Sequence, residues 1–393
     1  MGNVPNLRFP EFSGEWVTKS INDLAVVIGG GTPDTTVKSY WDGEIQWFTP
    51  SEIGKNKYVD SSLRTITEVG LNNSSAKLLP PNTILLSSRA TIGECSLSLR
   101  ECATNQGFQC LVSKKCNVDF LYYLIQTKKK DLIRKSCGST FLEISANEVR
   151  KIQVSVPSDV EQQKIAELLS LIDERIATQN KIIEDLKKLK SAISKHLFTR
   201  KDLLETTICL SEIATLRNGY AFQSSKYNAL GKWKILTITN VSGERHINDE
   251  DCNCIINLPD DIQDHQVLKE GDILISLTGN VGRVSLCKDG DYLLNQRVGL
   301  LQLAKNVNQE FLYQILSSQK FENSMIACGQ GAAQMNIGKG DVESYVLPYS
   351  SNGNNILWIA KILHSYDECI INEQRRLTLL TMQKQYLLTQ MFI

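Results

Sequence analysis

The segment Ile84-Leu-Leu-Ser-Ser-Arg-Ala-Thr-Ile-Gly93 decides the fold, because the chain repeats its pattern as Ile273-Leu-Ile-Ser-Leu-Thr-Gly-Asn-Val-Gly282, 189 residues later. Other blocks recur in the same order at nearly the same offset. They are 21–32 with 210–221, 43–49 with 231–237, 105–106 with 295–296, 120–122 with 311–313, and 165–169 with 359–363. Six blocks that keep their order indicate a duplicated domain, and a repeat fixes the architecture before any single motif does.

The first part of each copy has the pattern of a mixed β domain. Short apolar runs such as 83–88 and 272–277 are rich in Ile, Leu, Val and Thr, and Gly, Pro, Asn and Asp separate them. Such runs are typical of strands joined by turns. The stretch 118–135 indicates that each copy also contains helix.

Each copy ends in a long segment without Pro or Gly, residues 161–198 and 355–392. Apolar residues in both segments recur mainly every three or four positions, which predicts amphipathic helices about 57 Å long at roughly 1.5 Å per residue. Two such helices bury their apolar stripes best against each other. Since the first leads from domain one to domain two and the second starts at domain two, they should be antiparallel.

The expected fold is therefore α+β, with two similar domains joined by two long antiparallel helices that form a coiled-coil spacer with pseudo-twofold symmetry. It predicts a dumbbell in which the helices hold the domains apart. The expected bounds are 1–157 and 199–348 for the domains, and 158–198 and 349–393 for the helices.

Bulk composition places the chain among ordinary globular proteins. Of its 393 residues 42% are apolar and 22% charged, and Lys+Arg and Asp+Glu both total 43, so no net field attracts a polyanion. No apolar run approaches a membrane span and the start lacks a secretory pattern, so we expect a cytoplasmic protein with no membrane partner. Eleven scattered cysteines favour reduced thiols.

Two similar but unequal modules at a fixed separation suit a target with two unlike half-sites. The sequence has neither a nucleophile elbow nor histidines at the spacing of a metal-binding helix, and residues 29–33 lack the ending of a nucleotide-binding P-loop. The Cys-x-Cys spacing of Cys252 and Cys254 does not fit structural zinc, so no metal is expected. A coiled-coil adaptor that binds proteins and a nuclease with an unrecognised site remain the alternatives.

Motifs in both copies resemble the specificity subunits of type I restriction-modification systems. In the first copy they are Gly31-Thr-Pro33, Trp41-Asp-Gly-Glu-Ile-Gln-Trp47-x-Thr49, Ser88-Arg-Ala-x-Ile-Gly93, Asn105-Gln106 and Pro157-x-x-x-Glu161-Gln162-x-x-Ile165. In the second they are Gly219-Tyr-Ala-Phe222-x-Ser224-x-x-Tyr227, Gly271-Asp-Ile-Leu and Thr278-Gly-Asn-Val-Gly282. The resemblance covers nearly the whole chain, although residues 348–355 depart from the pattern of 157–162.

The resemblance implies a non-catalytic subunit that reads double-stranded DNA. Each domain would be a target-recognition domain for one half of a bipartite, asymmetric site. Two modification subunits would carry S-adenosylmethionine and methylate adenine, and restriction subunits would use ATP and Mg²⁺ for translocation and cleavage. This chain itself would bind no cofactor and contain no catalytic residue.

Residue chemistry and the loops that fail to align between the copies give the candidate DNA contacts. Arg can bind guanine with two hydrogen bonds, and Ser, Thr, Asn and Gln suit phosphates or base edges. The candidates are Thr32, Lys38, Lys57, Ser88, Arg89, Thr91, Ser139, Thr140, Asn218, Arg245, Thr278, Asn280, Arg297, Gln330 and Gln334. Candidate spacer and partner-docking residues are Glu161, Gln162, Ile165, Ile172, Ile176, Ile359, Tyr366 and Ile370.

Two further features have competing interpretations. The Asn-Gln pair at 105–106 and 295–296 could read adenine, but residues that read different half-sites should differ between copies, so an internal hydrogen-bonding role is favoured. The basic residues Lys128, Lys129, Lys130, Arg134 and Lys135 could hold phosphates or form a solvated helix face.

Overall fold

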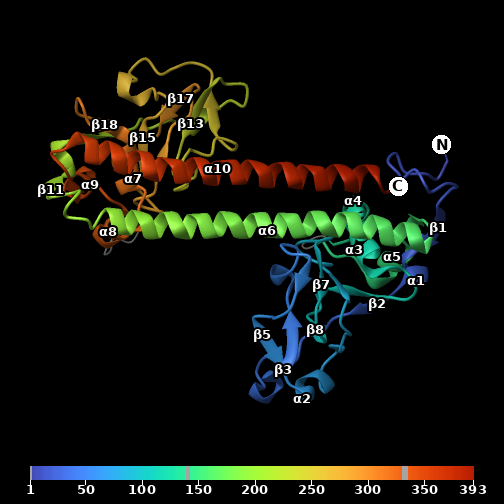
Figure 1. Ribbon diagram of the computed structural model, residues 1–393. Coiled ribbons are helices and arrows are strands. Elements are labelled where there is room, and N and C mark those ends of the chain that lie inside the picture. The colour runs from blue at the N-terminus through green and yellow to red at the C-terminus, as the bar shows by residue number, and fades with distance from the viewer. Residues whose placement is uncertain (1, 139–141, 330–334) are drawn as a thin grey trace. The chain divides into compact units, whose positions relative to one another are not determined.

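The computed structural model describes residues 2–138, 142–329 and 335–393, and its internal contacts divide the chain into two units (Figure 1). Unit 1 comprises residues 1–180 and 375–393, and unit 2 comprises residues 181–374. Each unit therefore holds one mixed domain together with part of each long helix. The expected four-segment domain bounds stay predictions.

Unit 1 begins with its mixed domain and continues into the first long helix. Its elements are β1 (Val17–Ser20), α1 (Ile21–Leu24), β2 (Ala25–Gly29), η1 (Lys38–Tyr40), β3 (Trp41–Phe48), η2 (Pro50–Glu52), β4 (Tyr58–Val59), β5 (Arg64–Ile66), α2 (Glu68–Asn72), β6 (Ile84–Leu86), β7 (Cys95–Ser98), β8 (Cys102–Thr104), β9 (Gln109–Ser113), α3 (Val118–Thr127), α4 (Lys129–Arg134), α5 (Ala146–Lys151), β10 (Gln153–Val156) and α6 (Asp159–Leu197).

Unit 2 takes the end of α6 and then follows a similar order of elements, without counterparts of η2 and β4 among its named elements. They are β11 (Thr206–Cys209), η3 (Leu210–Glu212), β12 (Ala214–Asn218), η4 (Ser224–Lys226), β13 (Trp233–Leu236), β14 (Asn253–Ile255), η5 (Asp264–Gln266), β15 (Ile273–Ser276), β16 (Val284–Leu286), β17 (Tyr292–Leu294), β18 (Val298–Leu303), α7 (Gln309–Leu316), α8 (Gln319–Cys328), α9 (Lys339–Glu343), β19 (Val346–Tyr349) and α10 (Gly353–Gln390).

Strand pairing is duplicated as well. Unit 1 has the strand orders β1-β10, β2-β9-β6-β7-β4 and β5-β3-β8, and unit 2 has β11-β19, β12-β18-β15-β16 and β14-β13-β17. The pairs β3·β8 and β13·β17 are both parallel, among otherwise mostly antiparallel strands. The expectation of two similar α+β domains and two long helices is thus confirmed, from the pairing as well as from the sequence blocks.

The helix expected over 118–135 is in fact two helices, α3 and α4, separated at Lys128. The backbone of Lys128 has φ −91° and ψ 9°, outside the helical region, and the Thr127 hydroxyl donates to the Leu124 carbonyl at 2.7 Å. That side-chain bond takes up a carbonyl at the end of α3, as helix ends require.

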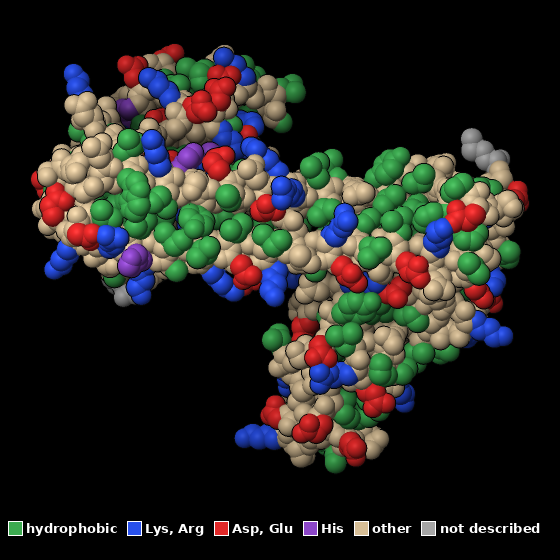
Figure 2. Space-filling model, viewed as in Figure 1, with side chains coloured by type: hydrophobic (Ala, Val, Ile, Leu, Met, Phe, Trp, Pro, Cys, Tyr) green, Lys and Arg blue, Asp and Glu red, His purple; other side chains and the backbone are tan. Residues whose placement is uncertain are grey.

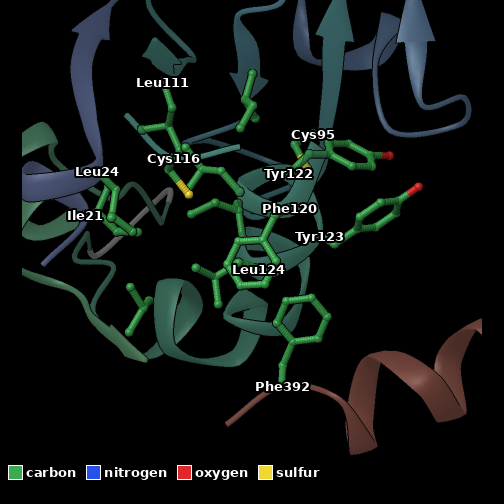
Figure 3. Packing of buried hydrophobic residues seen from close by; sticks show 14 of the residues in the cluster. Ile21, Leu24, Cys95, Leu111, Cys116, Phe120, Tyr122, Tyr123, Leu124 and Phe392 are labelled. Carbon is green, nitrogen blue, oxygen red and sulfur yellow. The ribbon is translucent and has the colours of Figure 1, made fainter. Parts of the chain in front are cut away.

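In unit 1 the domain core is continuous with the two long helices. Phe120 of α3, Leu169 of α6 and Leu388 of α10 belong to one buried cluster. Figure 3 shows Phe392, just after α10, directed toward Phe120, and the two rings stack with centroids 5.3 Å apart. Because the end of α10 lies beside the start of α6, the two helices are antiparallel in this unit.

Unit 2 has an equivalent core built by the other ends of the same helices. Phe311 of α7, Ile359 and Leu363 of α10, and Leu197 at the end of α6 share one buried cluster. Burial of such residues contributes roughly 1.5–3 kcal/mol each. In both units, therefore, the long helices are part of the domain core.

Candidate nucleic-acid interface

Three polar segments meet in unit 1: the β6–β7 turn (87–93), the loop after β8 (105–108) and the segment before α5 (142–145). The Ser88 amide donates to the Gly107 carbonyl at 2.8 Å, and the Ile144 amide donates to the Ser88 carbonyl at 3.1 Å. The three segments therefore lie side by side although they are distant in sequence, and they form one surface on which Arg89, Thr91 and Gln106 are at least partly exposed.

Unit 2 brings the equivalent segments together with equivalent bonds. The Leu277 amide donates to the Arg297 carbonyl at 3.0 Å, and the Ile337 amide donates to the Leu277 carbonyl at 2.9 Å. The surface is therefore duplicated, with β15 and β16 in place of β6 and β7.

The turn itself is held by a serine and a glycine in each unit. Gly93 and Gly282 donate from their amides to the carbonyls of Ser87 and Ser276, at 3.1 and 2.9 Å. Both glycines have positive φ, 88° and 79°, which residues with a side chain rarely adopt. These repeated residues have a structural role. They fix the backbone conformation of the turn and thereby the positions of the neighbouring side chains.

Positions 89 and 278 are equivalent, and they differ in chemistry. The Arg89 side chain is 42% exposed, and its guanidinium lies 2.9 Å from the Glu143 carboxylate. Of the six buried side-chain atoms without a hydrogen-bond partner in the described part of the chain, three lie at these two equivalent turns: Ser88 Oγ and Arg89 Nε in unit 1, and Thr278 Oγ1 in unit 2. Buried polar atoms are normally paired, so these three are the best candidates for contacts with a ligand.

Other candidates lie on the same surfaces or next to them. Thr91, Asn280 and Arg297 are exposed in the turn and the adjoining loop. The Thr32 hydroxyl donates to the Gln106 amide oxygen, which ties the segment after strand β2 to this loop. Outside these segments, Lys38 is exposed at the start of η1 and Asn218 at the end of β12.

Two candidates are engaged inside the protein and are withdrawn as DNA contacts. Lys57 Nζ is 2.6 Å from Asp119 and donates to Ser170, and only 7% of its side chain is exposed. Arg245 is paired with Glu310 and is 10% exposed. Both were chosen as basic residues in unaligned loops, and sequence alone did not show the acidic partners that use their charge.

Four candidates, Ser139, Thr140, Gln330 and Gln334, lie outside the described residues. Each falls in the polar segment that precedes α5 or α9.

The internal interpretation of the Asn-Gln pairs is confirmed for both asparagines. Asn105 Oδ1 accepts from the Gly107 amide at 2.8 Å, and Asn295 Oδ1 accepts from the Arg297 amide at 3.1 Å. Each asparagine thus closes the same local turn, which explains why the repeat keeps it.

The basic run is partly neutralised by its own unit. Lys129 pairs with Glu94, Arg134 pairs with Asp131, and Lys128 Nζ donates to the Ile393 carbonyl at 2.6 Å. Lys128, Lys129 and Lys130 line a groove of about 1050 Å³. On the face shown in Figure 2, Lys and Arg side chains are interspersed with Asp and Glu. Phosphate contact and a solvated face both remain open for this run.

The residues chosen for spacer and docking are mostly buried within their own unit. Glu161 accepts from Arg8 at 2.7 and 2.8 Å, and Gln162 accepts from the Asn117 amide at 3.1 Å. These two polar residues attach the domain to α6, so they are not free for docking. Ile165, Ile172, Ile359 and Ile370 are buried, whereas Ile176 and Tyr366 are partly exposed.

Sequence reasoning missed the polar residues that join each domain to its helices. They are Asp119, Ser170, Asp173 and Lys384 in unit 1, and Lys190, Glu310, His364 and Asp367 in unit 2. One signal was available, because Asp173 and Asp367 occupy the same place in the repeat, inside a helix stripe that is otherwise apolar.

Within the described residues, no three His, Cys, Asp or Glu side chains are placed to hold a metal ion. The same part of the chain contains no helix both long enough and apolar enough to cross a membrane. That the chain binds no cofactor stays a prediction.

The family model for the type I restriction modification DNA specificity domain matches twice, over residues 13–188 and 205–382. The type I restriction enzyme MjaIX specificity subunit of Methanocaldococcus jannaschii is 39% identical over 189 residues, which cover 47% of this chain and 44% of that protein. The EcoR124I/EcoR124II specificity subunit of Escherichia coli is 31% identical over 206 residues, half of each chain. The matches thus span about half the length of these relatives.

The fold is also found among solved structures. The crystal structure of the S subunit of a type I restriction-modification system from M. genitalium matches 99% of both chains, with a TM-score of 0.59 and 18% identity. At this identity the likeness concerns the fold.

Proposed function

This chain belongs to the family of type I restriction-modification DNA specificity proteins, and on that basis we propose that it selects the DNA sequence on which a multisubunit restriction-modification enzyme acts. The observation that carries the proposal is the double family match, with one copy in each mixed domain. Two readers in one chain suit a target made of two half-sites.

The two half-sites should differ in sequence. The turns of the two units share their backbone bonds, yet position 89 is Arg where position 278 is Thr, and position 91 is Thr where position 280 is Asn. Arginine pairs best with guanine and asparagine with adenine, whereas threonine is less selective. Equal backbones with unequal side chains therefore support a bipartite, asymmetric target.

Catalysis belongs to partners in this proposal. The chain would bind double-stranded DNA and two modification subunits that use S-adenosylmethionine to methylate adenine. Restriction subunits would supply ATP- and Mg²⁺-dependent translocation and cleavage. The relatives named above are specificity subunits of type I restriction enzymes, which supports such an assembly.

The test is genome-wide mapping of methylated adenine in a host that lacks its own restriction-modification systems. The chain is co-expressed with its cognate modification subunit, and an inactive modification subunit serves as control. A bipartite motif that appears only with both active components supports the proposal. No motif from a verified soluble complex with an active methyltransferase would favour the adaptor alternative.

A matched pair of variants sharpens the test. Arg89→Ala removes the arginine of the candidate surface, and Arg100→Ala removes an exposed arginine paired with Asp60 elsewhere in unit 1. We expect Arg89→Ala to relax or change one half of the motif at a cost of about 1–3 kcal/mol in discrimination. Arg100→Ala should leave both halves unchanged, and equal effects of the two variants would remove Arg89 from the interface.

A further inference from the structure

A buried polar cluster joins each mixed domain to the long helices, and we call it the junction cluster. In unit 1 its cation is Lys57, whose Nζ lies 2.6 Å from Asp119 of α3 and donates to Ser170 of α6 at 2.7 Å. Asp173 of α6 accepts from the Tyr123 hydroxyl at 2.7 Å and pairs with Lys384 of α10 at 2.7 Å. The domain is thereby bonded to both helices.

Unit 2 has an equivalent cluster in which some of the residue types differ. Arg245 binds both oxygens of Glu310 on α7, at 2.6 and 2.9 Å, and also lies 3.0 Å from Asp367 and 3.0 Å from His364 Nδ1 of α10. Asp367 further accepts from Gln314.

The opposite long helix again contributes a lysine. Lys190 of α6 lies 2.6 Å from Asp367, as Lys384 of α10 lies 2.7 Å from Asp173. The roles of α6 and α10 are thus exchanged between the two units.

Backbone geometry shows that the two clusters are equivalent. The carbonyl of Lys57 accepts from the Leu97 amide, and the carbonyl of Arg245 accepts from the Leu286 amide, both at 2.7 Å. The acids of α3 and α7 are 191 residues apart, and the acids of the long helices are 194 residues apart, which are the offsets of the repeat at those places. The charges at these positions are therefore kept in both units, although Lys57 is replaced by Arg245 and Asp119 by Glu310.

The burial of their charged side chains argues against a role for the clusters in stabilising the fold alone. The side chains of Lys57, Arg245 and Asp367 are 7%, 10% and 8% exposed, whereas those of Asp119 and Glu310, at the edge of each cluster, are 38% and 25% exposed. Removing charges from water costs several kcal/mol per ion, which their mutual attraction repays only with good geometry. Compared with an apolar contact, such a cluster fixes the relative orientation of the domain and the helices. Its hydrogen bonds and ion pairs are satisfied in one arrangement, whereas apolar surfaces can slide past each other.

We propose that the junction cluster positions each recognition domain on the helices and thereby sets the distance between the half-sites that are read together. The proposal rests on the proposed function. Since α6 and α10 each contribute to both units, a change of angle at one junction changes the separation over which two half-sites fit. Lys57 and Arg245 are positioning residues in this view, and they touch no DNA.

The experiment measures methylation by the full complex on a DNA library in which the half-sites are held constant and their separation varies by single base pairs. The triple variant Arg245→Met, Glu310→Gln, Asp367→Asn removes the arginine and both carboxylates of the cluster in unit 2, and only the Lys190 cation is left there. We expect the preference for the native separation over its one-base-pair neighbours to fall at least about ten-fold, since the domain can then tilt.

Arg245→Lys is the second variant, and it keeps the charge that unit 1 uses at this place. It loses the two-point bond to Glu310, so its preference should fall by a smaller factor, about three-fold, and it carries the test if the triple variant does not fold. The control is Lys234→Gln with Asp249→Asn, which breaks the 2.8 Å ion pairs of Asp249 with Lys234 and Lys288, in unit 2 but away from the helices. The control should keep the native preference.

The outcomes separate this inference from the proposed function. Equal loss of methylation at every separation, or an unchanged preference in the junction variants, would overturn the positioning role. A wild-type complex without any preferred separation would instead overturn the bipartite reading itself.

Discussion

Unit 1 and unit 2 follow the same chain path but begin their long helices in different ways. In unit 1 the carboxylate is on the helix: Glu161 of α6 is 1% exposed and accepts from Arg8 and Trp16, which precede β1. In unit 2 the carboxylate precedes the domain: Glu205, before β11, accepts from Ser350 and Ser351, ahead of α10. Each helix start is thus tied to the segment before the first strand, with acceptor and donor exchanged.

Both units therefore connect the helix start to the segment before the first strand, although different residues make this connection. This difference in bonding is the structural counterpart of the sequence difference between residues 348–355 and the pattern of 157–162. The start of α6 has a buried ion pair, and the start of α10 has an exposed set of serine bonds. Variants made in equivalent pairs therefore show which parts of the two units are equal and which are not.

The first prediction concerns stability and tests whether the hydrophobic cores of the two units contribute equally to it. Phe120→Ala and Phe311→Ala each remove a fully buried ring, so each should lower the free energy of unfolding of its own unit by about 3–5 kcal/mol. Urea unfolding, followed by amide exchange to assign the loss to a unit, is the measurement. Val26→Ala, at a half-exposed strand position, serves as control, and a loss below about 1 kcal/mol in either aromatic variant would contradict the equality.

The next effect concerns two glycines at equivalent places, Gly30 and Gly219. A Cβ would lie 1.9 Å from the Asn105 carbonyl oxygen at the first and 2.2 Å from the Asn295 carbonyl oxygen at the second. Alanine at either position should cost up to about 3 kcal/mol, because backbone must move to make room. Thermal unfolding measures the cost. Gly353→Ala, where no atom lies within 4 Å, is the control, and equal stability of all three variants would refute the close approach.

The features that the sequence predicted and those that it missed differ in the distance along the chain between the residues that form them. The blocks, the turn glycines and the helix stripes repeat similar residue types at nearly the same offset, so one sequence suffices to find them. The ties at the junctions and helix starts join residues such as Arg8 and Glu161, 153 positions apart, and several of their residue types differ between copies. Although Asp173 and Asp367 recur in the sequence, no pattern along the chain indicates their partners, because only folding brings the partners together.

The same limit explains the two withdrawn DNA contacts. Lys57 and Arg245 resemble surface basic residues in sequence, and their burial depends on acids of helices far along the chain. The asparagines of the two Asn-Gln pairs were interpreted correctly, since their partners lie two residues away.

A third prediction separates the helix starts. Glu161→Gln leaves the largely buried Arg8 guanidinium without its charged partner, so the free energy of unfolding should fall by about 2 kcal/mol, the size of a hydrogen bond to a charged group. Chemical denaturation measures the loss. The matched variant Glu205→Gln alters an exposed carboxylate and should be much milder, and comparable losses would show that the two starts are energetically alike.

The smallest effect is the pH dependence of the start of α10. Hydrogen bonds from the Ser351 amide and from the Ser350 and Ser351 hydroxyls lower the pKa of Glu205 from its ordinary 4.5 to about 2. A carboxyl whose folded pKa is depressed contributes stability that is fully present above its ordinary pKa and is lost as pH falls through the folded pKa. Between pH 4.5 and about 2 the first turn of α10 should therefore loosen while the start of α6 does not respond through this group. Amide exchange of Ser351 against pH measures this, and Glu205→Gln should remove the dependence. If that variant keeps the pH dependence of the wild type, another group controls the start of α10. The exchange of donor and acceptor between the units would then have no effect on stability.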